Sequence, residues 1–251
     1  MKTTAAYLKV PWKTELRQID LPDSPRPGWV RLRVDACGIC GTDITEALSR
    51  KDWGPFGHEV AGTLLALGQG VDAATLPVGT SVVVESASAC GRCASCRDGR
   101  LDLCQGGAPN IWGEPALGFS TVMDAPACAC VPYAGLEPKV ACLAEPAGVA
   151  YDLVVTADIR LGDRVCVVGP GPIALMAIAL AFRRGAAEVV CIGPRHSEAR
   201  LALARELGAS IRFSTSRAST AAPIKAWARP ICTPPGSSRP GRAARTAHRP
   251  S

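Results

Sequence analysis

The sequence has no long apolar run. Its longest apolar stretch covers Pro172–Phe182, which is far short of the ~20 residues that a membrane-spanning helix needs. The N-terminal residues carry scattered charges and lack the apolar segment of a signal peptide. We therefore expect a cytoplasmic protein with no membrane partner.

Acidic residues are missing from the end of the chain. The last one is Glu206, and the eight lysines and arginines beyond it outweigh the whole net charge of +6. The positive net charge therefore comes from the end of the chain and is poor evidence that the folded part binds nucleic acid. Residues 214–251 also combine six prolines with no apolar periodicity, and such a composition cannot bury enough surface to fold. We expect a disordered basic tail there.

Histidine is scarce, with three residues, whereas cysteine is abundant, with twelve. Four thiols fall within one short stretch, at Cys90, Cys93, Cys96 and Cys104. Two-residue gaps let neighbouring thiolates converge on one ion, and the fourth thiolate closes the tetrahedron that Zn²⁺ prefers. We predict a structural four-thiolate zinc site. Reduced or redox-active cysteines and an iron–sulfur cluster are the alternatives.

Residues 1–145 have the pattern of a compact β-rich domain. Val30–Ala36 alternates apolar and charged residues, as in a half-buried strand. Val60–Leu67 and Val82–Val84 are further short apolar runs rich in strand-forming residues. Proline and glycine separate these runs. We expect this β-rich domain to end near residue 145.

Residues 146–213 change to alternating strands and helices. Strands are expected at Arg164–Val168, Glu188–Ile192 and Ser210–Phe213, and helices at Ile173–Phe182 and Ser197–Leu207. A glycine-rich turn joins the first strand to the first helix. This order of elements predicts a mixed α/β chain whose second part is the first half of a doubly wound dinucleotide-binding domain.

The glycine-rich turn reads Gly-Pro-Gly-Pro-Ile-Ala over residues 169–174. Gly169 permits the tight turn, Gly171 lets the backbone approach a pyrophosphate, and Ala174 replaces a third glycine. A purely structural turn is the alternative. Ile173 and Arg200 complete the residues that we assign to cofactor binding.

The second strand of this region lacks the acidic residue that reads a ribose 2′-hydroxyl. It is followed instead by Gly193, Pro194 and Arg195. An arginine at this place can pair with a 2′-phosphate. The sequence therefore favours NADP over NAD, with a solvated surface charge as the alternative role for Arg195.

Two further motifs bring a cysteine and a histidine into the β-rich domain. They are CGICGTD, which contains Cys40, and GHE, which contains His58. Taken alone, either residue is more often part of a core. The chain also contains the four-cysteine stretch and the motifs AEPAGVA and VVGPGPIA. With these five motifs in this order, the sequence resembles the zinc-containing medium-chain dehydrogenase/reductase family of alcohol, polyol and threonine dehydrogenases. The resemblance runs from about residue 3 to residue 213.

The resemblance implies a GroES-like zinc-binding catalytic domain over residues 1–145 and a partial Rossmann domain over residues 146–213. It also implies two zinc ions per chain, a structural one in the cysteine cluster and a catalytic one held by Cys40, His58, Glu59 and Glu145. In this family pattern Asp43 orients His58, Thr42 relays the substrate proton, and Glu59 lies close to the metal. Glutamate at position 145, where alcohol-type relatives carry cysteine, favours a polyol, sugar alcohol or amino alcohol.

The implied function is hydride transfer between a secondary alcohol and NAD(P), in a homo-oligomer. The second half of the family's cofactor domain is not readable after about residue 213, so we expect a truncated or frameshifted chain. The alternatives are a truncated, catalytically impaired zinc-binding relative, and a zinc-binding interaction module. A nucleic-acid binder that uses the cysteine cluster and the basic tail is the least favoured.

Overall fold

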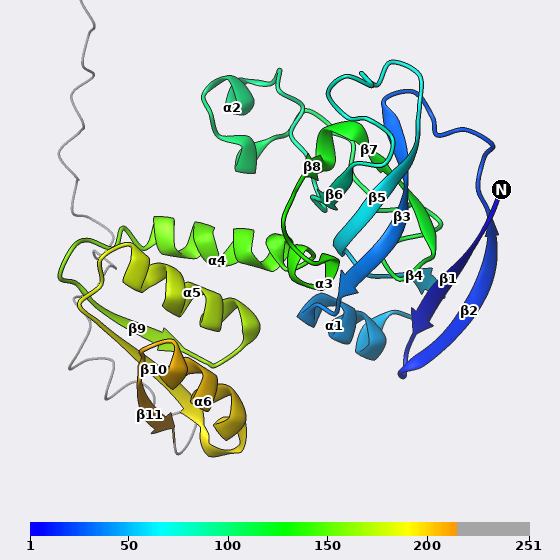
Figure 1. Cartoon of the computed structure of the whole chain (residues 1–251). Helices are drawn as coiled ribbons and strands as arrows, with labels where there is room; N and C mark the ends of the chain where they lie inside the picture. Colours follow the sequence, from blue (N-terminus) through cyan, green and yellow to red (C-terminus); the bar gives the residue numbers. More distant parts are fainter. Residues whose placement is uncertain (215–251) are drawn as a thin grey trace, which may run out of the picture. The chain divides into compact units, whose positions relative to one another are not determined.

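The computed structural model describes residues 1–214, which divide into two compact units, Met1–Leu153 and the residues from Val154 onward. Figure 1 shows both units, coloured along the sequence. The division falls within α4 (Ala144–Thr156), a few residues beyond the boundary predicted near residue 145. The predicted tail lies outside the described residues, except for Ser214. No described helix is long and apolar enough to cross a bilayer.

The first unit is built on a five-stranded antiparallel sheet with the order β7-β3-β5-β6-β8. Its strands are β3 (Trp29–Gly38), β5 (Glu59–Leu67), β6 (Ser81–Val84), β7 (Val122–Pro126) and β8 (Cys130–Pro132). A smaller antiparallel sheet has the order β2-β1-β4, with β1 (Lys2–Lys9), β2 (Lys13–Asp20) and β4 (Gly54–Pro55). The three strands predicted in this region coincide with β3, β5 and β6.

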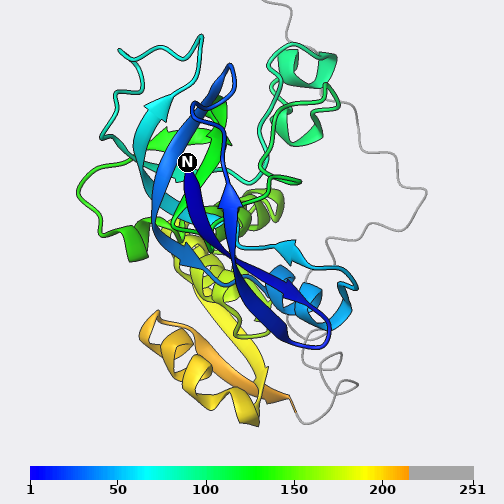
Figure 2. The same cartoon turned by 90° about the vertical axis from the view of Figure 1, so that its right-hand side faces the viewer.

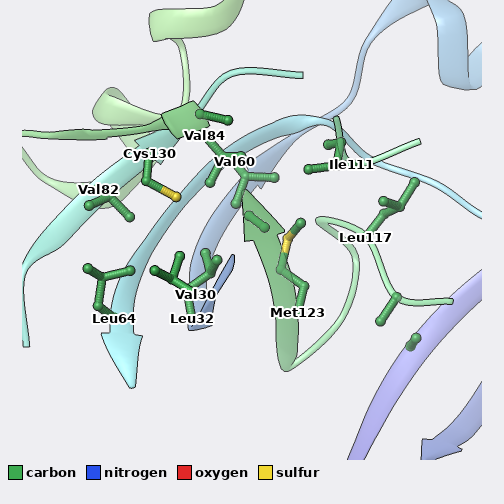
Figure 3. Packing of buried hydrophobic residues seen from close by; sticks show 14 of the residues in the cluster. Val30, Leu32, Val60, Leu64, Val82, Val84, Ile111, Leu117, Met123 and Cys130 are labelled. Atoms are coloured by element: carbon green, nitrogen blue, oxygen red, sulfur yellow. The ribbon is translucent and has the colours of Figure 1, made fainter. Parts of the chain in front are cut away.

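Apolar side chains from the five-stranded sheet converge on one core, which Figure 3 shows from close by. Val30 and Leu32 of β3 and Val82 of β6 are fully buried there, as period-two alternation requires. Arg31 lies between the first two in sequence and is also buried, with 2% of its surface exposed. Its guanidinium donates to both carboxylate oxygens of Asp124 at 2.7 and 2.9 Å. A buried charge is tolerated here because it is paired in this bidentate way.

The first unit also contains helices α1 (Gly41–Ser49), α2 (Ala94–Arg97) and α3 (Pro138–Ala141), and the short 3-10 turns η1 (Leu101–Leu103) and η2 (Ala127–Ala129). Helix α1 begins directly after Cys40, where the Asp43 carboxylate accepts the Cys40 N–H at 2.8 Å. Such a side-chain acceptor satisfies one of the unpaired N–H groups at a helix start. Figures 1 and 2 both show the loop that carries α2 projecting from the sheet.

The second unit contains a parallel sheet with the order β11-β10-β9. Its elements are β9 (Arg164–Val168), α5 (Pro172–Arg183), β10 (Glu188–Pro194), η3 (Arg195–Ser197), α6 (Glu198–Glu206) and β11 (Ser210–Ser214). The central strand β10 is buried from Val189 to Gly193. Each strand and helix predicted for this region is present, with ends that coincide or differ by at most two residues.

Candidate metal centres and nucleotide turn

The four cysteines of the predicted structural zinc site lie together. Their sulfur atoms all fall within 4.8 Å of one another. The Cys93 and Cys96 sulfurs are 3.5 Å apart, and those of Cys90 and Cys96 are 3.9 Å apart. A tetrahedron with metal–sulfur bonds of about 2.3 Å has edges of roughly 3.8 Å. The sulfur spacing therefore fits four thiolates around one zinc ion.

Backbone amides make this loop favourable for thiolates. The N–H of Cys90 donates to the Cys104 sulfur at 3.3 Å, and the N–H of Cys93 donates to the Cys90 sulfur at 3.4 Å. Backbone hydrogen bonds, with that of Cys96 the strongest, lower the pKa of Cys93 to about 6. Burial raises the pKa of Cys96 to about 12. A divalent cation would overcome this difference by holding all four sulfurs as thiolates.

Gly106 allows the chain to pass close to this cluster. A Cβ atom at Gly106 would lie 2.2 Å from the Cys90 sulfur and 3.0 Å from the Cys90 Cβ. Real Cβ contacts of that length do not occur, so only glycine fits without moving a proposed ligand. The loop geometry is therefore adapted to the thiol cluster itself.

A second group of predicted site residues surrounds Asp43, which is buried in the first turn of α1. Its carboxylate accepts the N–H of Cys40 at 2.8 Å and the N–H of Gly57 at 3.2 Å. It thereby joins the end of β3 to the start of β5, where His58 and Glu59 lie. Asp43 Oδ1 is also 3.9 Å from His58 Nδ1.

His58 is the residue whose bonding is incomplete. It is 5% exposed, and within the described part of the chain its Nδ1 is buried without a hydrogen-bond partner. A small approach of the ring to Asp43 would satisfy Nδ1 and fix the tautomer. The other nitrogen, Nε2, would then be available as a ligand. This orphaned atom fits the predicted role of Asp43 as the group that orients a metal-binding histidine.

Glu59, Glu145 and Thr42 are the remaining predicted residues of this group. Burial raises the pKa of Glu59, and the charge of Glu145 raises it further. Glu145 is half-buried and accepts a hydrogen bond from Ser86 Oγ at 3.3 Å. The exposed Thr42 hydroxyl is 3.6 Å from the Cys40 sulfur. The site therefore places a thiol, an imidazole, two carboxyl groups and a hydroxyl near one another.

The predicted catalytic ligands do not close around a single point. Among residues 1–214, the four-cysteine cluster is the one group of three or more potential ligands whose atoms all lie within 4.8 Å. Cys40 shares a hydrogen bond with Glu59 and also contacts Thr42, whereas Glu145 contacts Ser86. Ligands that carry the same charge separate in this way unless a cation draws them together.

The structure adds a residue that sequence reasoning missed. The Trp112 ring lies 5.2 Å from the His58 ring, tilted by 52°. The backbone N–H of Trp112 donates to Asn110 Oδ1 at 3.0 Å, and the neighbouring Ile111 is fully buried. The indole is nevertheless 45% exposed. Trp112 thus places an aromatic ring beside His58, and no sequence motif predicts this contact.

The predicted nucleotide turn joins β9 to α5. Gly169 has φ +94, a conformation that favours glycine, and its N–H donates to Ile192 O at 2.8 Å. Gly171 precedes α5, and a Cβ there would meet nothing within 4 Å. Pro172 occupies the first helical position. The helix N-terminus is therefore open to an anionic group, as a pyrophosphate would need. Ile173 and Ala174 follow on α5, half-buried.

The end of β10 gives a packing reason for Gly193. A Cβ at Gly193 would lie 3.0 Å from Leu201 Cδ2 and 3.0 Å from Pro170 Cδ. Arg195 is exposed, and its guanidinium lies 4.7 Å from the centre of the Phe213 ring. Arg200 is exposed on α6. Close packing therefore disfavours a larger residue at 193, whatever the cofactor.

Comparison with known proteins places these features in a family. The profile of the alcohol dehydrogenase GroES-like domain matches residues 26–135. L-threonine 3-dehydrogenase of Pyrococcus abyssi is 36% identical over 219 residues, covering 83% of this chain and 59% of the relative. L-galactonate-5-dehydrogenase of Escherichia coli is 34% identical, covering 71% of this chain and 52% of the relative. The chain thus spans less than two thirds of the length of these relatives.

Solved structures resemble the same fold. The 2R,3R-butanediol dehydrogenase from Bacillus subtilis matches with a TM-score of 0.73 and 26% identity, over 90% of this chain and 67% of the other. A putative zinc-binding dehydrogenase from Sinorhizobium meliloti 1021, bound to NADP, matches with a TM-score of 0.74 and 26% identity, over 92% of this chain and 66% of the other.

Proposed function

Because this chain belongs to the zinc-containing, alcohol dehydrogenase-like family of medium-chain dehydrogenases, we propose that it serves hydride transfer between a secondary alcohol and NAD(P). The observation that carries the proposal is the arrangement of the half-buried Cys40 with the buried Asp43 and His58. There one carboxylate holds the backbone on both sides of the site and faces an imidazole nitrogen that lacks a partner.

The substrate class that we propose is a polyol, sugar alcohol or amino alcohol. Glu145 supports this because its carboxylate, hydrogen-bonded to Ser86, brings negative charge and an acceptor to the site. The relatives named as threonine, galactonate and butanediol dehydrogenases act on alcohols that carry a second polar group next to the carbinol. A hydroxyl or ammonium group on the substrate would find an acceptor there.

Zinc held by Cys40 and His58 would act as a Lewis acid and lower the pKa of the substrate hydroxyl. Asp43, whose Oδ1 lies 3.9 Å from His58 Nδ1, would keep the imidazole oriented once a small approach of the ring lets the carboxylate accept from the ring N–H. The exposed Thr42 hydroxyl, next to Cys40, accepts the substrate proton and passes it to solvent. A bound NAD(P) would supply the nicotinamide ring that accepts the hydride from the carbinol carbon. Glu59 and Glu145 would complete the set of ligands around the zinc, as the family resemblance implies.

We propose NADP as the preferred cofactor, on the basis of Arg195. Its exposed guanidinium lies directly after β10, and its face is steadied by Phe213. Comparing the Michaelis constants of the two cofactors tests this, with Arg195→Ala as the matched variant. A strong preference for NAD in the unaltered chain would refute it. A homo-oligomer remains a prediction from the family resemblance, and a cytoplasmic location remains a prediction from the pattern of charged and apolar residues in the sequence.

The deciding experiment combines metal analysis with cofactor reduction. We expect two zinc ions per chain, and reduction of NADP with L-threonine, butane-2,3-diol or a sugar alcohol. His58→Ala should remove one zinc and the activity, whereas a change in the four-cysteine cluster should remove the other zinc. One zinc per chain without cofactor reduction would instead support the catalytically impaired zinc-binding relative.

A further inference from the structure

The Cys37 sulfur lies against the turn that carries His58. Cys37 precedes Gly38, which is paired with Glu59 in the antiparallel register of β3 and β5. A Cβ atom at Gly57, the residue before His58, would lie 2.9 Å from the Cys37 sulfur. The backbone N–H of Glu59, the residue after His58, donates toward the same sulfur. One sulfur atom therefore contacts the chain on both sides of His58.

Gly57 is enclosed by its neighbours in this turn. A Cβ there would also lie 2.5 Å from Phe119 Cδ2, so an aromatic ring and the Cys37 sulfur both approach its Cα. The Gly57 N–H donates to Asp43 Oδ1 at 3.2 Å, and its carbonyl accepts the N–H of Gly118 at 2.9 Å. Asp43 and Gly118 thus fix the two peptide groups of Gly57, and the sulfur fills the space against its Cα.

The sulfur fits because it lies between two glycines. A Cβ at Gly118 would lie 2.4 Å from the Cys37 sulfur, closer than any real contact. The thiol also donates to Gly38 O at 3.4 Å, which fixes its direction. If the sulfur were removed, neither Gly57 nor Gly118 has a side chain that could fill the space, and glycine backbone moves more readily than that of other residues. Loss of the sulfur would therefore let the turn at His58 shift.

We propose that Cys37 is a positioning residue whose sulfur holds the backbone on both sides of His58 and so aligns the imidazole with Cys40. The inference rests on the proposed metal centre. Cys40 follows Cys37 by three residues and directly precedes α1, so one short segment carries both a proposed ligand and the sulfur that seats the other ligand. Groups that orient metal ligands typically contribute about 10–100-fold to metal affinity. Asp43 would act on the imidazole ring, whereas Cys37 acts on the backbone that carries it.

Cobalt(II) titration tests the proposal, because the visible absorption of cobalt reports the arrangement of its ligands. Spectra are recorded as differences from Cys40→Ser, which retains the four-cysteine cluster. Cys37→Ala should weaken cobalt binding at Cys40 and His58 about tenfold and shift the visible bands, because the imidazole leaves its position. Cys37→Ser should recover most of the affinity, since a hydroxyl can still accept from the Glu59 N–H and donate to Gly38 O.

Cys130→Ala is the matched control that separates this role from a structural one. Cys130 is a buried thiol of the core in Figure 3, and it donates to Pro126 O at 3.4 Å, as Cys37 does to Gly38 O. Its loss should lower the melting temperature but leave the cobalt affinity and spectrum unchanged. The proposal is overturned if Cys37→Ala fails to fold, if it binds cobalt as the unaltered chain does, if Cys130→Ala loses as much affinity, or if Cys37→Ser recovers none.

Crystal structures of metal-free Cys37→Ala and of the unaltered chain give an answer that does not depend on the proposed function. If the unaltered chain binds no cobalt outside the four-cysteine cluster, the proposed metal centre fails. The role of the sulfur is then judged by atomic positions alone. Movement of Gly57 and His58 toward the vacated space, with β3 unmoved, supports that role, whereas a turn that stays in place overturns it.

Discussion

Replacing Asp43 by alanine should damage both the fold and the proposed metal centre. The carboxylate accepts two backbone N–H groups, from Cys40 at 2.8 Å and from Gly57 at 3.2 Å. Hydrogen bonds to a charged group contribute about 1.5–3 kcal/mol each. The Gly57 bond is buried, so its N–H would be left unsatisfied. We therefore expect Asp43→Ala to lower the free energy of unfolding by about 3–5 kcal/mol.

The same substitution should weaken metal binding at Cys40 and His58 by about 10–100-fold, because His58 loses the group that orients its ring. Asp43→Asn keeps one oxygen acceptor and should have a smaller effect on both quantities. Urea denaturation measures the stability, and competition with a chelator measures the affinity.

Asp72→Ala is the matched control for this prediction. Asp72 accepts the Ala74 N–H at 2.9 Å and the Thr75 hydroxyl at 2.6 Å, but it is exposed and belongs to a loop between β5 and β6. Its loss should leave metal affinity unchanged. Unaltered metal affinity in Asp43→Ala, at metal concentrations where the variant remains folded, would refute the reasoning about His58.

Three further predictions concern other parts of the chain. Zinc affinity of the four-cysteine cluster should rise with pH, because Cys96 loses its proton on binding throughout the range below its pKa of about 12. It should fall more steeply below about pH 6, where Cys93 also becomes protonated; a chelator titration that shows no pH dependence contradicts this. Cobalt binding should quench the fluorescence of Trp112, which lies beside His58. Trp112→Phe should abolish that quenching. The control Trp29→Phe, at the far end of β3, should not abolish it. Arg31→Met should lower the free energy of unfolding by about 3–5 kcal/mol, because Asp124 is left buried and unpaired. Replacing both residues by apolar ones should recover most of this loss. Equal losses in the single and double variants would disprove the pairing argument.

Local pattern was enough to predict the second unit. Its strands and helices are short, periodic and separated by glycine, so each element depends mainly on its own residues. The four-cysteine cluster was readable for the same reason, since its ligands lie within one loop and short spacing brings their sulfurs together. The motif around Cys40 and His58 was also visible, although the helix α1 that begins there was not among the predicted elements.

Only the tertiary structure could decide how distant segments meet. The alternation in β3 placed Arg31 on a polar face, but the pairing of β3 with β7 buries it against Asp124, ninety-three residues away. The contact of Trp112 with His58 and the pairing of Gly38 with Glu59 arise in the same way, from a loop anchor and a strand register. The period of apolar residues and the spacing of cysteines are properties of one segment, so they can be read from the sequence. Register and packing depend on which segments are neighbours in space, and no single segment contains that information.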